Sequence, residues 1–204
     1  MGPHPLGSRH QIFGGLAAKD VHPLRKLGLN LHQPGKAYQG FTLISPMEGT
    51  NTYLIDMQGR IVHRWQLPYR PGDHGYLLDN GNLLIGGRTN KGPVDIGGKS
   101  GIILELDWDG NRVWEYEEPT LHHDFSRLPN GNTMVTGWEL VPPETMKEVK
   151  GGVAGSEPAA GMWSDYFREV TVQGDTVWEW HAHEHLDPVA DAICPLHRRA
   201  EWTH

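Results

Sequence analysis

Residues Ile103–Tyr116 read ILELDWDGNRVWEY, with apolar and polar residues alternating on both sides of an Asp-Gly pair. This pattern is typical of a β-hairpin, because a strand has a side-chain period of two and Asp-Gly suits a tight turn. Two further stretches have the same pattern, TYLIDMQGRIVHRW at Thr52–Trp65 and REVTVQGDTVWEW at Arg168–Trp180. In each copy an aromatic residue follows the turn glycine at the same distance: Gly59 and Trp65, Gly110 and Tyr116, Gly174 and Trp180. The chain therefore repeats one hairpin.

A second hairpin pattern with an Asn-Gly turn follows the first two copies. It reads YLLDNGNLLIGG at Tyr76–Gly87 and SRLPNGNTMVTG at Ser126–Gly137. Two hairpins in a repeat of about fifty residues have the length and strand content of a β-propeller blade. We expect an all-β chain that supplies about three blades, near 39–100, 101–150 and 165–204, after an N-terminal extension at 1–38.

Two stretches without a strand pattern interrupt this order, at 139–165 and 181–201. The first is rich in Gly, Ala and Pro, and both a lid and a mobile surface insertion fit it. Propellers close with four to eight blades, so about three blades leave strand edges unpaired. The expected partner is therefore the remainder of a propeller, as a C-terminal segment or chain, or a second copy.

Composition excludes several classes of protein. With 25 acidic and 18 basic residues, the net charge of −7 argues against nucleic-acid binding. One cysteine, Cys194, excludes an internal disulfide. The first thirty-five or so residues contain no long apolar run, which predicts neither a signal peptide nor a membrane span, and a cytoplasmic location is the expectation.

Histidines gather beside the second hairpin. Aligning the Asn-Gly turns places His123 and Asp124 opposite Asp73 and His74, and His204 at the matching position of the third copy. An imidazole binds an anion when protonated, acts as a base when neutral, or ligates a metal. We therefore expect these residues to line one axial channel.

A second histidine group is HAHEH at 181–185. On a strand, His181, His183 and His185 would lie on one face, as metal ligands sometimes do. The zinc-protease motif needs Glu directly after the first histidine, and Ala182 holds that place. A metal site and a solvated polar segment both remain open.

The motifs DMQGRIVHRW, DWDGNRVWEYEEPTLHHDFSRLPNGNTM and VQGDTVWEWHAHEHLDP with the later EWTH resemble those of the bacterial arylsulfotransferase family. The resemblance implies a six-bladed propeller that moves a sulfuryl group from a phenol ester to another phenol through a transiently sulfated histidine, without a nucleotide donor. The segment HHD at 122–124 is similar to the family's first active-site histidine motif, and His204 to a second. The sulfated histidine of the family lies in a later blade and has no counterpart in this sequence.

The favoured function is that of an arylsulfotransferase-like enzyme acting on a small phenolic or anionic substrate without a cofactor. The expected catalytic residues are His122, His123 and His204, which bind and polarise the sulfuryl group, and Asp124, which orients a ring. The expected substrate-binding residues are His74 and Arg127. A rival hypothesis is a hydrolase or lyase that holds a divalent metal with His123, His204, His181 and His183. A third is a non-catalytic propeller that serves as an interaction platform.

Overall fold

The computed structural model describes residues 29–93, 97–157 and 159–203, and the regular secondary structure of this part is almost wholly β-strand, in three antiparallel sheets. The first sheet has the order β1 (Thr42–Ile44), β2 (Asn51–Ile55), β3 (Ile61–Gln66). The second has the order β4 (Pro71–Leu77), β5 (Leu83–Arg88), β6 (Gly101–Leu106), β7 (Arg112–Glu117). The third has the order β8 (Leu121–Arg127), β9 (Thr133–Leu140), β10 (Trp163–Val170), β11 (Thr176–His181).

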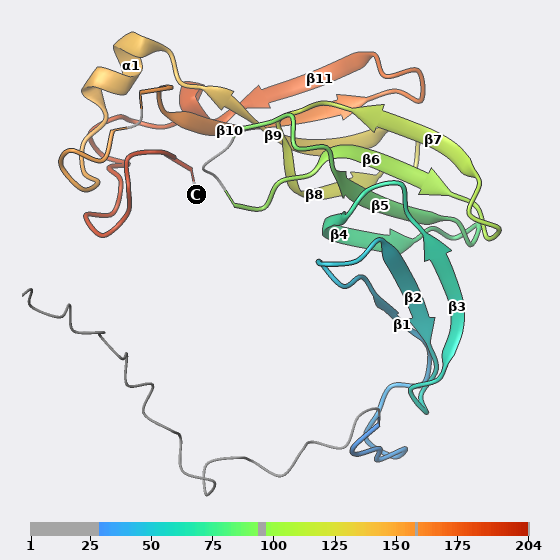
Figure 1. Cartoon of the computed structure of the whole chain (residues 1–204). Helices are drawn as coiled ribbons and strands as arrows, with labels where there is room; N and C mark the ends of the chain where they lie inside the picture. Colours follow the sequence, from blue (N-terminus) through green and yellow to red (C-terminus); the bar gives the residue numbers. More distant parts are fainter. Residues whose placement is uncertain (1–28, 94–96, 158, 204) are drawn as a thin grey trace, which may run out of the picture.

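The sheets follow one another along an arc, with β3, β7 and β11 on its outer side (Figure 1). The opposite edge strands of the second and third sheets, β4 and β8, contact each other. This arrangement is that of consecutive propeller blades with inner and outer strands, and it confirms the all-β, propeller-like fold expected from the repeats. Most of the expected extension 1–38, as well as His204, lies outside the described residues.

Sheet boundaries differ from repeat boundaries. β5, in the second hairpin of one repeat, pairs along its whole length with β6, in the first hairpin of the next repeat; the register runs from Leu83 opposite Leu106 to Arg88 opposite Gly101. The sheets therefore span 42–66, 71–117 and 121–181, whereas the expected blades were 39–100, 101–150 and 165–204. The second and third sheets have the four strands that two hairpins supply, whereas the first has three.

The middle sheet buries both of its faces because it packs between the first and third sheets, and neighbouring residues of its strands point to these two faces in turn. One face packs on the first sheet, through a cluster of Leu54, Trp65, Leu67, Leu83, Ile85, Ile102, Leu104 and Leu106. The other packs on the third sheet, through Leu84, Ile103, Leu121, Phe125, Val135 and Val170. Because both faces are buried, β5 and β6 consist mostly of apolar residues.

Indole hydrogen bonds join successive sheets on the outer side. Trp65 of β3 donates its Nε1–H to the carbonyl of Asp107, in the turn between β6 and β7, at 2.9 Å. Trp114 of β7 donates likewise to the carbonyl of Val172, in the turn between β10 and β11, at 2.9 Å. Each outer strand therefore bonds to the hairpin turn of the next sheet.

The two insertions pack against each other at the end of the third sheet (Figure 1). The first contains α1 (Pro143–Glu148), and the second begins with the 3₁₀ turn η1 (Ala182–Glu184). They share a core of Val141, Val149, Met162, Ile193 and Trp202. Backbone bonds from Lys150 to Pro188 and from Ile193 to Lys150, each 2.9 Å, tie them together. Helices in the described ranges are too short and too polar to cross a bilayer.

Tyr166 of β10 is buried. Its ring explains why a glycine stands opposite it in the neighbouring strand β9. A Cβ at Gly137, its partner in β9, would lie 2.3 Å from the phenol oxygen. The hydroxyl shares a 3.2 Å hydrogen bond with Thr120. Burial raises the pKa of Tyr166 to about 12, against a partly compensating hydrogen bond from Thr120.

We expect Trp65→Ala to lower the free energy of unfolding by about 3–5 kcal/mol, because it removes a fully buried indole and a bond between sheets. Denaturant unfolding followed by circular dichroism measures the loss. Trp178→Ala is the matched control, since that indole is 47% exposed and should cost less than about 1 kcal/mol. Equal losses in the two variants would contradict the assigned role of Trp65.

A raised pKa makes the contribution of Tyr166 to stability depend on alkaline pH. The neutral phenol is favoured by the folded state, so this contribution is present below pH 10 and is lost as the pH rises towards 12. Relative to Tyr166→Phe, the unmodified protein should lose about 2–3 kcal/mol over this range. The measurement is unfolding free energy against pH for both proteins, and parallel curves would refute the burial argument.

Candidate functional site

The inner strands β4 and β8 carry the same irregularity. In β8, Leu121 pairs with Gly137 and the next pair is Phe125 with Val135, so residues 122–124 face one residue of β9. In β4, the flanking pairs are Pro71 with Gly87 and Gly75 with Ile85, so residues 72–74 bulge in the same way. Bulges re-aim side chains out of the ladder. The HHD segment and its counterpart in β4 are therefore both released from regular pairing.

His122 points back into the third sheet. Its ring is 3% exposed and stacks on Trp138 at a centroid distance of 4.0 Å and an angle of 12°. Its Nε2 lies 3.2 Å from the Oδ1 of Asp165, which pairs with Trp138 across the sheet. The expected site residue His122 is thus held by an indole face and a carboxylate.

His123 has a positive φ of 47°, which is unusual for a non-glycine residue and is imposed by the bulge. Its backbone N–H donates to the carbonyl of Gly98 at 2.9 Å. Its ring lies directly over Gly98, where a Cβ would come within 1.9 Å of the imidazole Cε1. Only a glycine leaves this space for the ring.

The two histidine rings are joined through their Nδ1 atoms, 3.0 Å apart. One proton lies between them, so one ring donates and the other accepts. Together with Asp165, the contacts form a line from a carboxylate through His122 to His123. Such a line fixes the orientation of both rings, and the carboxylate can compensate charge that develops on His123.

Asp124 contacts the ring of His74. Its Oδ1 accepts the N–H of Phe125 at 2.7 Å and lies 3.3 Å from the Nε2 of His74. The ring of His74 packs against Phe125 at 5.0 Å. The structure therefore brings His74 and Asp124 together across the junction of β4 and β8, and Asp165 occupies the carboxylate position beside His122.

A cavity of about 320 Å³ adjoins this junction on the side of the first sheet. It is lined by Leu43, Ser45, Met47, Gly72, Asp73, His74 and Gly75. Its volume is at the small end of ligand pockets, and its lining combines apolar side chains with His74 and Asp73. Of the expected site residues, this cavity touches His74, whereas a larger cavity of about 630 Å³ at the hairpin-turn end of the sheets is lined in part by Arg127.

Arg127 lies away from the histidines. Its guanidinium bonds to Glu105 at 2.8 Å and to the carbonyl of Gly131 at 3.0 Å, and lies 4.5 Å over the ring of Trp114. This arrangement supports the hairpin turn, and Arg127 also lines the cavity at that end of the sheets. His204 lies outside the described residues, but its neighbour Thr203 accepts the backbone N–H of Asp165 at 2.9 Å.

A second cluster involves HAHEH, although not on a strand. The strand ends at His181, and η1 turns the chain so that His183 returns towards Glu139. Both oxygens of Glu139 lie 2.8 Å from the Nδ1 of His181, and one lies 3.5 Å from the Nε2 of His183. His185 leaves the cluster and stacks on Trp180 at 4.8 Å. The expected common face of three histidines is therefore wrong.

Sequence reasoning missed Trp138, Glu139 and Asp165. These residues reach the histidines because β9 pairs with β10, which places Trp138 opposite Asp165 and Glu139 opposite Ser164. No local sequence pattern predicts this pairing. Because side chains alternate along a strand, Asp165 and Glu139 lie on opposite faces of the third sheet. The two histidine clusters are thus separate sites.

We expect Gly98→Ala to displace the ring of His123 and shift its imidazole resonances, because the new methyl group takes the ring's place at a positive φ of 76°. Heteronuclear NMR of the histidine side chains measures this shift. Gly97→Ala is the control, since a Cβ there meets nothing within 4 Å. Unchanged resonances in Gly98→Ala would contradict the close packing.

Comparison with known proteins places the chain in a family. The protein from Bacteroides caccae whose structure is described as that of a protein of unknown function shares 17% identity, with a TM-score of 0.44. The similarity covers 70% of this chain and 46% of that one, so the chain spans less than half of that protein's length. No curated protein matches the sequence. The family described as Arylsulfotransferase (ASST) matches residues 30–204, and the chain therefore belongs to the arylsulfotransferase family.

Proposed function

We propose that this chain contributes to an arylsulfotransferase-like site, in which His122 and His123 help to move a sulfuryl group between small phenols. Family membership supports this class of reaction. The single observation that carries the assignment to these residues is the pair of matching bulges, which frees residues 72–74 and 122–124 from the ladders at one junction.

In this proposal His123 binds the sulfuryl oxygens. Its ring is half-buried, and its position is set on two sides, by Gly98 and by the Nδ1 of His122. When a sulfuryl group transfers, negative charge spreads over its oxygens and the departing phenolate. A His123 that gives its Nδ1–H to His122 has a second N–H for that charge only as the imidazolium, and such a preorganised donor lowers the barrier because it needs no reorganisation during the reaction.

His122 and Asp165 act through His123. The carboxylate lies 3.2 Å from one nitrogen of His122, and the other nitrogen faces His123 at 3.0 Å. Charge accepted by His123 is therefore opposed by a carboxylate two contacts away. In this role His122 is a positioning residue, and its stacking on Trp138 keeps it from turning out of the line.

His74 binds the substrate at the edge of the cavity, and Asp124 orients its ring. Leu43 and Met47 supply apolar surface there for an aromatic ring, and His74 supplies a polar group at the same wall. The bond from Asp124 holds the imidazole of His74 towards the junction. A phenolic substrate needs this combination of an apolar wall and a few placed polar groups.

We also propose that the site is completed by further propeller sheets, from another segment, chain or copy. Trp114 of β7 is covered by the turn of the next sheet, whereas Trp178, in the corresponding strand β11, is 47% exposed. Within the described part of the chain, the indole of this outer strand is therefore left without the turn that covers its counterpart in β7.

The test uses the protein assembled with its further sheets, with 4-nitrophenyl sulfate as donor and phenol as acceptor. We expect phenol-dependent release of 4-nitrophenolate, and a loss of about 10²–10³-fold in kcat/KM for His123→Ala, the cost of removing one preorganised donor. His122→Ala should lower kcat more than it raises KM, because that ring supports His123 without touching the donor.

His185→Ala is the matched control, because His185 lies outside the site and stacks on Trp180. It should leave kcat/KM within about twofold of the unmodified protein. Release that does not require phenol, or that survives His123→Ala, would contradict the proposal. Retained binding of a partner with no turnover would favour the interaction platform.

A further inference from the structure

Glu139, His181 and His183 bring three ligand atoms together outside the site described above. One oxygen of Glu139, one nitrogen of His181 and one nitrogen of His183 all lie within 4.8 Å of one another. The side chains are 24%, 26% and 15% exposed, respectively. They are therefore held in place by the sheet, yet an ion from solvent can reach them.

Their distances suit one metal ion. Ligands at about 2.0–2.1 Å from a tetrahedral zinc ion lie roughly 3.3 Å from one another. Here the Nδ1 of His181 is 2.8 Å and the Nε2 of His183 is 3.5 Å from the same oxygen of Glu139. The two histidine nitrogens lie within 4.8 Å of each other, so the three atoms are close enough to share one ion.

A hydrogen bond between Glu139 and His181 accounts for only two members of the cluster. It does not explain why η1 returns the chain so that His183 points its Nε2 at the same carboxylate oxygen. At 3.5 Å that contact is at the limit of a hydrogen bond, whereas a shared ion would satisfy both rings at once.

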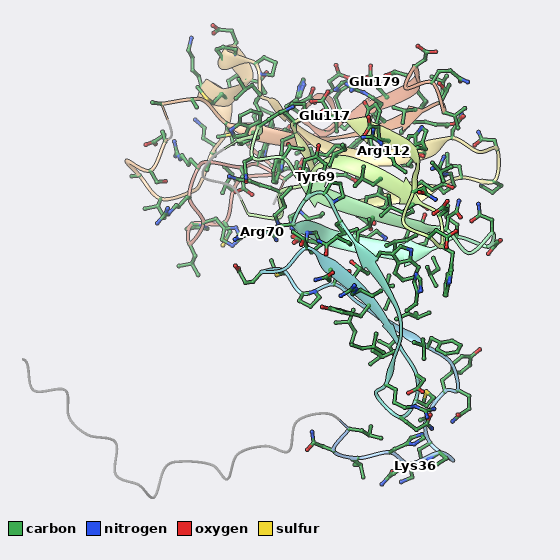
Figure 2. The ribbon with its side chains drawn as sticks, turned by 45° about the vertical axis from the view of Figure 1, so that its right-hand side comes forward. Lys36, Tyr69, Arg70, Arg112, Glu117 and Glu179 are labelled. Atoms are coloured by element: carbon green, nitrogen blue, oxygen red, sulfur yellow. The ribbon has the colours of Figure 1, made fainter. Side chains whose placement is uncertain are left out.

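An outer carboxylate is also present. The other nitrogen of His181, Nε2, lies 4.0 Å from the Oε2 of Glu179 on the same strand. Figure 2 shows Glu179 on β11, at the upper side of the molecule, far from Lys36. Metal-ligating histidines commonly face a carboxylate with their second nitrogen, because this fixes the ring and increases its basicity.

We propose that Glu139, His181 and His183 form a binding site for a divalent transition-metal ion, zinc being the ion that this ligand set suits best. Two imidazoles and one carboxylate leave a fourth position open to water or to another ligand. The proposal is independent of sulfuryl transfer, since this cluster lies on the opposite face of the third sheet.

The ion would join the roots of the two insertions. Glu139 is at the end of β9, where the first insertion leaves the sheet, and His181 and His183 are where the second leaves it. The insertions already share a small apolar core. A metal bridge at their roots would fix how this pair of insertions is attached to the propeller.

The test measures zinc binding to the full chain after removal of metal with a chelator. Isothermal titration should give one site that is weakened at least about a hundredfold by His183→Ala and by Glu139→Gln. Glu179→Gln should weaken binding about tenfold, as expected for an outer partner. Addition of zinc should raise the melting temperature of the unmodified protein and not that of His183→Ala.

His185→Ala is the matched control, because it removes a histidine of the same segment that lies outside the cluster. All variants keep the remaining histidines of the chain, so differences between them report this site. Cobalt in place of zinc should give a visible absorption band that is lost in His183→Ala even when that variant remains folded. Zinc affinity that is equal in all variants, or lowered as much by His185→Ala, would overturn the proposal.

Discussion

In β8, residues 122–124 face a single residue of β9, because regular pairing stops at Leu121 and resumes at Phe125. A strand without this bulge would send His122 and Asp124 to one face and His123 to the other. The bulge instead buries His122 on Trp138, turns His123 into the left-handed region and exposes Asp124. The contacts of the first site therefore depend on a break in the backbone ladder, and the same break in β4 places His74 beside Asp124.

The bulge costs conformational free energy, which contacts with neighbouring residues have to offset. A positive φ at a residue other than glycine costs on the order of 1–3 kcal/mol. In this protein the backbone bond from His123 to Gly98 and the line of contacts from Asp165 offset that cost. A strained residue that is fixed from several sides is preorganised, which is the property that stabilisation of a transferring anion requires.

Local patterns in the sequence were sufficient to predict the hairpins, because turn glycines and period-two strands are set by neighbouring residues. They were not sufficient to predict which hairpins share a sheet. That depends on the long-range pairing of β5 with β6, which no local pattern in either strand predicts. The same limit applied to the residues of the site. His74, His123 and Asp124 follow from aligned turns, whereas Asp165 and Glu139 reach the histidines only through the β9–β10 ladder. The ion pair of Arg127 with Glu105 could not be predicted either, because it crosses from one sheet to another.

The offset between repeats and sheets limits how such a protein can be recombined. If one fifty-residue repeat were exchanged for another along the sequence boundaries, each graft would carry half of two sheets, and both new ladders would join unrelated strands. Crossovers in the short connections before β4 and before β8 would transfer whole sheets with their hydrogen bonds intact. Shuffling of members of this architecture should therefore yield folded chimeras mainly when the exchange points fall there, regardless of where the sequence similarity begins.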